Sequence, residues 1–261
     1  MTIDHSILDW FVAGRSAGEI LFLLAVAFVA GLARGFSGFG AALIFVPLAS
    51  SVIGPQVAAP LLLIIDMVAA LGMLPQAWRL GDRASVGTMT IGALVGVPIG
   101  TYVLTQVEPL VVRWVIVGLV VLLLGLLMSG WRYRGTPATP LTIGVGALSG
   151  FFSGAAQVGG PPVVAYWLGG QSSGGVVRAN IVLYFAVSSV LTTISYLVGG
   201  LLGWPIVGLA LTVGPLYGLG LFLGALLFGR ASARVFTWTC YGLIAFAAVA
   251  SLPSLDPLLR N

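Results

Sequence analysis

Apolar residues fill ten separate runs of the chain, which fall into two successive sets of five. In each set, two short runs precede three runs of about 20 residues, the length with which a helix crosses a bilayer. The first set covers residues 20–34, 41–53, 57–78, 84–105 and 110–131. The second set covers residues 141–152, 161–169, 177–198, 204–228 and 235–252. This pattern predicts an all-α polytopic membrane protein.

The two sets define the expected organisation of the chain. A first transmembrane repeat at 20–131 and a second at 141–252 are joined by a cytoplasmic linker at 132–140. Residues 1–19 carry acidic and polar side chains without a basic region, so we expect an extramembrane arm there rather than a signal peptide. Residues 253–261 form the C-terminal tail.

Glycine and proline are concentrated where the two short runs of each set meet. The sequence GLARGFSGFGAALIFVP occupies residues 31–47, and the similar sequence GALSGFFSGAAQVGGPP occupies residues 146–162. Both residue types weaken or interrupt a helix. In lipid, an irregular backbone is tolerated only where protein buries it or where it lines a cavity, as in the broken helices of transporters. We therefore expect a broken-helix, re-entrant-like hairpin in each repeat.

The arginine positions test this topology, because short cytoplasmic loops collect positive charge. If each short pair adds no net crossing, seven arginines share one side of the membrane, and Arg15, Arg113 and Arg260 lie on the other. One long helix in place of each short pair would remove most of this bias. The favoured topology has both termini outside and the two repeats in opposite orientations, which makes them inverted repeats. Two short crossings in place of each hairpin give the same parity and remain an alternative.

Composition limits the classes of function. The chain is 59% hydrophobic and 7% charged, and its net charge of +4 is spread too thinly for a nucleic-acid surface. Cys240 is alone, which leaves neither a disulfide nor a thiolate metal site. We find no P-loop, no metal-ligand cluster and no nucleophile with a base, so neither a metal nor a cofactor is expected and an enzyme is disfavoured.

The two motifs, the duplication and the length together resemble the TauE/SafE sulfite-exporter family, also called the toluene-sulfonate uptake permeases. The segments that carry the resemblance are GFSGFGAALIFVP at 35–47 and GFFSGAAQVGGPP at 150–162. The similarity spans residues 20–252. It implies transport of small sulfur-containing anions such as sulfite and sulfonates, often outward. We accordingly expect an integral protein of the bacterial inner membrane.

Anion chemistry independently suits the two breaks. A helix that begins at mid-membrane directs its first free N–H groups and its partial positive charge toward the cavity. Glycine lets a ligand approach this backbone, and proline is preferred in the first turn of a helix, where no donor is lost. The alternative is that these small residues only allow close helix packing. The expected donors are Ser37, Gly38 and Gly40 at the first break, and Ser153, Gln157, Val158, Gly159 and Gly160 at the second.

Two ionisable residues lie within apolar runs, where charge is unfavourable and usually functional. Arg34 precedes the first break and either binds an oxyanion or extends to the interface. Asp66 is a proton-coupling candidate, a counter-charge to Arg34 or a structural hydrogen-bond donor. Asn180 and Tyr184 are one helical turn apart, and they either line the path or bond neighbouring helices.

These observations predict a secondary transporter for a small anion that works by alternating access, with protons as a possible coupling ion. The alternative functions are an anion channel and, less favoured, a membrane-embedded enzyme. Saturable exchange in vesicles would distinguish the transporter from a channel. The expected partners are the anion and the lipid bilayer, and the sequence leaves the oligomeric state open.

Overall fold

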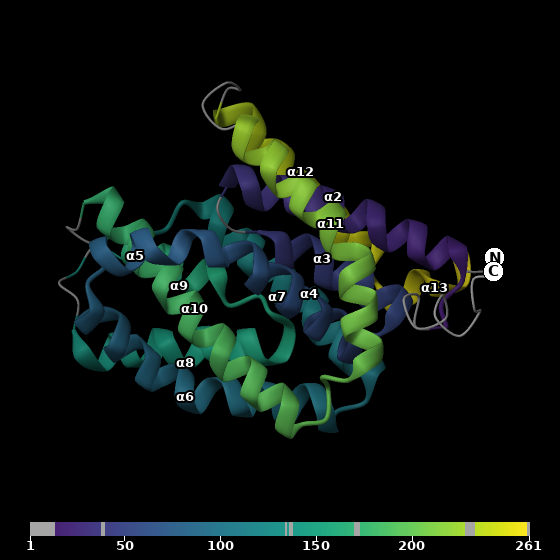
Figure 1. The fold of residues 1–261 in the computed structure, drawn as a ribbon, viewed down its shortest axis with the longest axis horizontal. Helices are drawn as coiled ribbons and strands as arrows, with labels where there is room; N and C mark the ends of the chain where they lie inside the picture. Colours follow the sequence, from purple (N-terminus) through teal and green to yellow (C-terminus); the bar gives the residue numbers. More distant parts are fainter. Residues whose placement is uncertain are drawn as a thin grey trace, which may run out of the picture. The chain divides into compact units, whose positions relative to one another are not determined.

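A computed structural model describes residues 14–37, 40–133, 135, 138–169, 173–227 and 233–259, and no strand occurs among these residues. The helices follow one another with short connections (Figure 1). Those of the first half are α2 Ala17–Ser37, α3 Ala41–Ile53, α4 Pro55–Ala70, η1 Leu71–Met73, α5 Leu74–Leu80, α6 Arg83–Gln106 and α7 Pro109–Ser129. Those of the second half are α8 Thr139–Ala156, α9 Gly160–Trp167, α10 Gly174–Val198, α11 Trp204–Leu227, α12 Ala233–Ala250, η2 Pro253–Leu255 and α13 Asp256–Leu259.

The predicted fold class is confirmed, because the described chain is helical and rich in long apolar helices. Six spans within it are long and apolar enough to cross a membrane. These spans are Ala17–Phe36, Pro55–Leu80, Arg83–Gln106, Pro109–Ser129, Gly174–Val198 and Trp204–Leu227. The opposite orientation of the two repeats stays a prediction.

The helix α2 is longer than the short run predicted at 20–34, and it can span a membrane by itself. Its start is fixed by Ser16 and Glu19, since the backbone N–H of Ser16 donates to the Glu19 carboxylate (2.9 Å) and the N–H of Glu19 donates to Ser16 Oγ (3.3 Å). This reciprocal capping satisfies N–H groups that the first turn of a helix leaves without partners. The helix therefore begins before the apolar run does.

The chain divides into two compact units, and neither unit is continuous in sequence. Unit 1 contains Met1–Ile65, Glu108–Val121 and Gly200–Asn261, and unit 2 contains Asp66–Val107 and Leu122–Gly199. Each unit joins segments of both sequence halves. The division into repeats at 20–131 and 141–252 is thus a different division of the chain, and it stays a prediction.

In unit 1, α2 packs closely along α11 through glycines on both helices. A Cβ atom on Gly31 would overlap the carbonyl oxygen of Tyr217, and one on Gly220 would overlap that of Phe28. Small residues let two backbones come this close and are typical of helix contacts within membranes. The first helix of one half is in this way fixed to the fourth apolar run of the other half.

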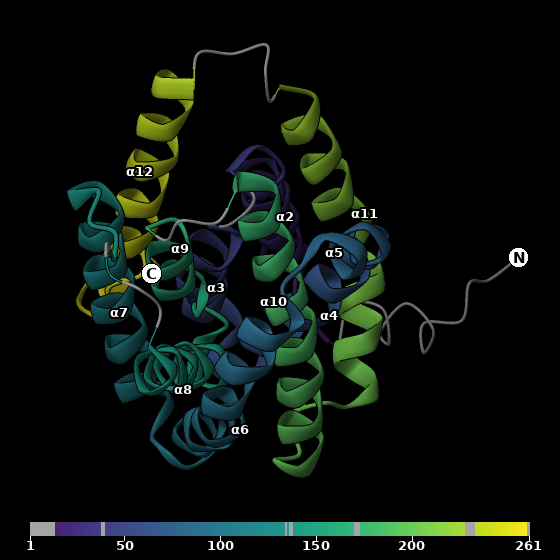
Figure 2. The same cartoon turned by 90° about the vertical axis from the view of Figure 1, so that its left-hand side faces the viewer.

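Unit 2 repeats this arrangement with the helices α6 and α8, which lie side by side (Figures 1 and 2). A Cβ atom on Gly92 would overlap the carbonyl oxygen of Ile143, and one on Gly146 would overlap that of Met89. Glycines recur at every fourth position along both helices, at Gly92, Gly96 and Gly100 of α6 and at Gly146, Gly150 and Gly154 of α8. This contact holds the backbone of α8 in place up to the break that follows it.

The start of the C-terminal tail is held by an ion pair within unit 1. The guanidinium of Arg113 in α7 contacts both carboxylate oxygens of Asp256 in α13, at 2.6 and 2.9 Å, and also donates to the carbonyl oxygen of Ser251 (3.2 Å). Two parallel hydrogen bonds to one carboxylate make this a directional contact. It ties α13 to the N-terminal part of α7.

Candidate functional site

The helices α8 and α9 are separated by a sharp turn at Gln157, Val158 and Gly159. Gln157 has φ 59° and ψ 16°, and it is the one non-glycine residue with positive φ in the described part of the chain. Its N–H donates to the carbonyl oxygen of Ser153 (2.9 Å), and the N–H of Val158 donates to that of Phe152 (3.2 Å). The turn therefore closes α8 through its own backbone.

The helix α9 begins at Gly160 and follows Gly159 as its N-cap residue, with Pro161 and Pro162 in its first turn. Helical geometry leaves the first N–H groups of a helix without intrahelical acceptors. The two prolines remove two of these donors, so the orphan donors of this helix are the amides of Gly159 and Gly160. Since the Val158 amide already bonds Phe152, it is not available in this conformation.

Two serine hydroxyls, one helical turn apart on α8, face Gly159. Ser149 Oγ donates to the carbonyl oxygen of Gly159 (2.7 Å). A Cβ atom on Gly159 would overlap Ser153 Oγ and would lie 2.5 Å from the carbonyl oxygen of Ser149. Both serines are buried, at 0% and 5% exposure. The break thus places two buried hydroxyls against a position that only glycine fits.

The side chain of Gln157 turns back onto the helix that precedes it. Its Nε2 donates to the carbonyl oxygen of Ser153 (3.1 Å) and lies 3.5 Å from the hydroxyl of Tyr196 on α10. The Tyr196 hydroxyl in turn donates to the carbonyl oxygen of Gly154 (2.8 Å). Gln157 and Tyr196 therefore cover the end of α8.

The two residues of α10 that the sequence singled out make contacts between helices. The Asn180 side chain accepts a hydrogen bond at Oδ1 from the N–H of Asp82 (2.7 Å), which is itself the N-cap of α6. The hydroxyl of Tyr184 donates to the carbonyl oxygen of Gly146 (3.2 Å). Asn180 and Tyr184 share a buried face of α10, and these bonds fix that face against α6 and α8.

Residues of the first break belong to unit 1, whereas the second break belongs to unit 2. Arg34 is half-buried in the last turn of α2, where the partial negative charge of a helix C-terminus favours a cation. Gly40 is the N-cap residue of α3 with φ 101°. Ser37 ends α2, but its side chain lies outside the described residues, as does Gly38.

Asp66 lies in α4, half-buried, among the first residues of unit 2. It is the first acidic residue after Glu19 in the sequence. Its position between two apolar stretches of the span Pro55–Leu80 agrees with a residue at membrane depth.

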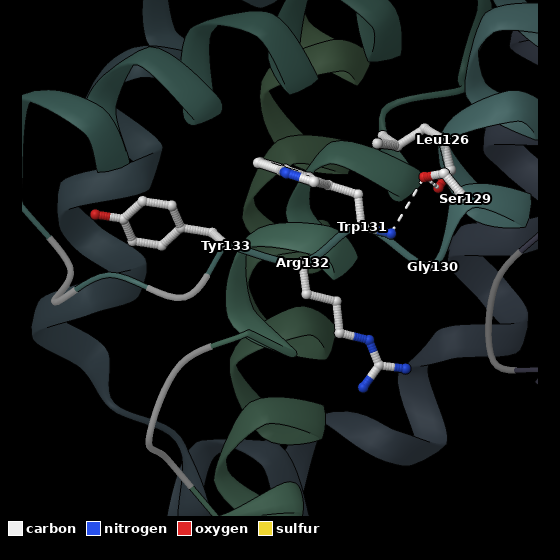
Figure 3. Close-up of a pocket in the computed structure, with 6 residues that line it drawn as sticks. All are labelled: Leu126, Ser129, Gly130, Trp131, Arg132 and Tyr133. Atoms are coloured by element: carbon white, nitrogen blue, oxygen red, sulfur yellow. Dashed lines mark hydrogen bonds between the residues drawn. The ribbon is translucent and has the colours of Figure 1, made fainter.

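A surface depression lies elsewhere in unit 2, at the end of α7. Its lining residues are Leu126, Ser129, Gly130, Trp131, Arg132 and Tyr133. The guanidinium and the two aromatic rings point in different directions, and the marked hydrogen bond runs from the Trp131 N–H to Ser129 Oγ at 3.1 Å (Figure 3). Because these side chains do not converge, the depression lacks the arrangement that binds a small anion, and the break between α8 and α9 is the better candidate.

Sequence reasoning overlooked Ser149 and Tyr196 as components of this site. The signal for Ser149 was its spacing of one helical turn from Ser153. The signal for Tyr196 was a regular spacing of polar residues in its run, since it follows Asn180 and Tyr184 at multiples of four.

We expect replacement of Gln157 by glycine to be tolerated better than replacement by alanine. Both changes remove the side-chain carboxamide. Alanine keeps a Cβ, which is unfavourable in the left-handed conformation of this residue, whereas glycine adopts that conformation freely. The difference in unfolding free energy should be about 1 kcal/mol in favour of Gln157→Gly. Denaturant or thermal unfolding in the same detergent measures it. Equal stabilities would show that the turn does not hold φ positive at this residue.

The fold and the broken helices in both sequence halves define a multi-pass integral membrane protein. A family model described as sulfite exporter TauE/SafE matches residues 23–251, and the chain belongs to this family. It is therefore a membrane transporter. No match was found among curated proteins or among solved structures.

Proposed function

We propose that this protein is a secondary transporter for small sulfur-containing anions, such as sulfite or a sulfonate, and that it exports them. Family membership supports the substrate class. The observation that carries the proposal for the site is the arrangement around Gly159, where the N-cap glycine of α9 contacts two buried serines of α8.

The chemistry of these groups suits an anion that sheds part of its water. Amide and hydroxyl donors form stronger hydrogen bonds with a charged acceptor than with a neutral one, and a helix N-terminus adds a partial positive charge. Buried neutral donors bind a sulfur oxyanion without a permanent counter-charge, so the empty site carries no uncompensated charge in the membrane.

The transport cycle that we propose is alternating access. Broken helices with glycine-rich turns occur in both halves, at Gly40 and at Gln157–Gly159. Transporters built from inverted repeats hold their substrates at such interruptions. Arg34, in the last turn of α2, is the candidate for an added guanidinium donor at the first break.

A ligand screen by thermal unfolding tests the substrate class. Sulfite, thiosulfate, sulfate, a short alkyl sulfonate and acetate would each be added to the purified protein. An anion that binds only the folded state, present at a concentration of 100 times its dissociation constant, raises the free energy of unfolding by about 2.7 kcal/mol. We expect sulfite or the sulfonate to raise the melting temperature more than acetate does. The proposal would be contradicted if only acetate raised the melting temperature, or if none of the five anions did.

We further propose that Asp66 couples transport to protons. Asp66→Asn removes the titratable group and preserves the shape of the side chain, so uphill transport driven by a pH gradient should be lost while anion exchange continues. Flux in proteoliposomes, measured with and without a pH gradient, separates the two activities. Unchanged uphill transport would exclude the coupling role, and a lower melting temperature with both activities reduced would assign Asp66 a structural role.

A further inference from the structure

A stripe of buried polar residues runs the length of α10 in unit 2. Its members are spaced four apart and are at most 2% exposed, and they are Asn180, Tyr184, Ser188, Thr192 and Tyr196. Residues four apart lie on nearly the same face of a helix. Buried polar side chains are normally hydrogen-bonded, so the partners of this stripe indicate what it contacts.

Four members of the stripe have partners within the protein. Asn180 and Tyr184 bond Asp82 and Gly146 as described above, and Tyr196 bonds Gly154. Thr192 Oγ1 donates to the carbonyl oxygen one turn earlier in its own helix, at 2.8 Å. Ser188 is the exception, because its Oγ is buried and has no hydrogen-bond partner among the described residues.

Two hydrogen bonds show which stretch of α8 this face of α10 is turned toward. The hydroxyls of Tyr184 and Tyr196 donate to the carbonyl oxygens of Gly146 and Gly154 on α8. Between the two glycines, α8 carries Ser149 and Ser153, the serines that face Gly159. Between the two tyrosines, the stripe on α10 carries Ser188. The unpaired hydroxyl therefore comes from the stretch of α10 that accompanies the break.

We propose that Ser188 donates its hydroxyl to the bound anion, as a substrate-positioning residue supplied by α10. This inference rests on the proposed function, since it adds a donor to the same site. An unpaired buried hydroxyl is unfavourable in the empty protein, and a ligand oxygen that accepts its hydrogen bond relieves that penalty. The bound anion then accepts a hydrogen bond from Ser188, the one member of the stripe whose hydroxyl lacks a partner among the described residues.

A donor from α10 also bears on the class of anion. The amides of Gly159 and Gly160 and the hydroxyl of Ser153 come from α8 and α9, and Ser188 comes from a separate helix. Donors on different helices reach an anion from different directions, which suits one that offers several acceptor oxygens. Sulfite and sulfonates carry three oxygens around a sulfur that lies out of their plane, whereas a carboxylate carries only two. We therefore infer that Ser188 favours sulfur oxyanions over carboxylates.

The test compares Ser188→Ala with Ser189→Ala, which removes the same hydroxyl from the neighbouring, half-buried position off the stripe. Dissociation constants for sulfite, ethanesulfonate and acetate, and melting temperatures without ligand, are measured on the full-length protein. We expect Ser188→Ala to bind sulfite or ethanesulfonate about ten- to a hundredfold more weakly, the usual effect of one lost hydrogen bond to a charged group. Its ligand-free melting temperature should be unchanged or higher, because an unpaired buried polar group has been removed. Ser189→Ala should match the wild type in both respects.

The outcomes separate this inference from the proposed function. If the wild type binds sulfite or ethanesulfonate and Ser188→Ala binds it equally well, the role of Ser188 is overturned and the proposed function stands. If Ser188→Ala melts at a lower temperature or fails to fold, the hydroxyl is structural and the inference is overturned as well. If the wild type binds none of the probes, the proposed function fails and this inference fails with it.

Discussion

Replacing Gly146 with alanine should destabilise the protein, whereas the same change at Gly144, two residues earlier on α8, should not. A Cβ atom on Gly146 would overlap the backbone carbonyl of Met89 on α6, and one on Gly144 would meet nothing within 4 Å. The obstacle at Gly146 is backbone, so the two helices would have to separate. Overpacking of this kind costs about 1–3 kcal/mol and sometimes more.

Gly144→Ala serves as the matched control, since alanine has the higher helix propensity by up to about 1 kcal/mol. Its melting temperature should equal or exceed that of the wild type. In unit 1, Gly220→Ala and Gly218→Ala on α11 form an independent pair of the same design, because only Gly220 faces a neighbouring backbone. Equal melting temperatures for Gly144→Ala and Gly146→Ala would show that α6 and α8 do not pack through glycine.

Replacing Gly159 with valine should abolish anion binding. Its Cβ would overlap Ser153 Oγ and approach the carbonyl oxygen of Ser149, so the branched side chain would displace the Ser153 hydroxyl and distort the turn where α9 begins. The variant displaces several proposed donors at once, each contributing about 1.5–3 kcal/mol to the binding of a charged ligand. We therefore expect a loss of more than about a hundredfold in affinity for sulfite or a sulfonate.

Stability has to be measured beside affinity for this variant, because the same overlap strains the turn. Gly159→Ala adds only a Cβ and gives an intermediate case, and Gly125→Val on α7 places valine where a Cβ meets nothing within 4 Å. Gly125→Val should bind like the wild type. Native affinity in a stable, purified Gly159→Val sample would place the anion away from the second break.

The boundaries of the helices followed closely from the sequence where glycine marks them. The run predicted at 41–53 coincides with α3, because Gly40 and Gly54 flank it with positive φ angles. The start of α2 was missed since Ser16 and Glu19 extend the helix beyond its apolar residues. Hydrophobicity locates a buried segment, whereas capping decides where the helix begins.

The pairing of helices could not be read from the sequence. Glycines at every fourth position in α2, α6, α8 and α11 predict close contacts, but they do not specify which helix meets which. The structure pairs α2 with α11 and α6 with α8, so each contact joins the two sequence halves. A repeat read from sequence therefore differs from a compact unit of the fold.

The second break was predicted as a local feature, and its neighbours were not. Glycine and proline located the turn at Gln157–Gly159, since those residues act on their own backbone. Ser149 and Ser188 depend on which face of each helix turns toward the break, a matter of tertiary packing. The spacing of four along α10 predicts that its polar residues share one face. The hydrogen bonds of Tyr184 and Tyr196 with α8 show which helix that face contacts.

Exchange of sulfur oxyanions across the membrane by this transporter can be measured by counterflow in proteoliposomes. Vesicles loaded with unlabelled sulfite would be diluted into a trace of sulfite labelled with radioactive sulfur. We expect transient, saturable accumulation of label that internal sulfite stimulates and that Gly159→Val abolishes. Uptake that rises linearly with sulfite concentration, or that internal sulfite does not stimulate, would contradict the proposed function.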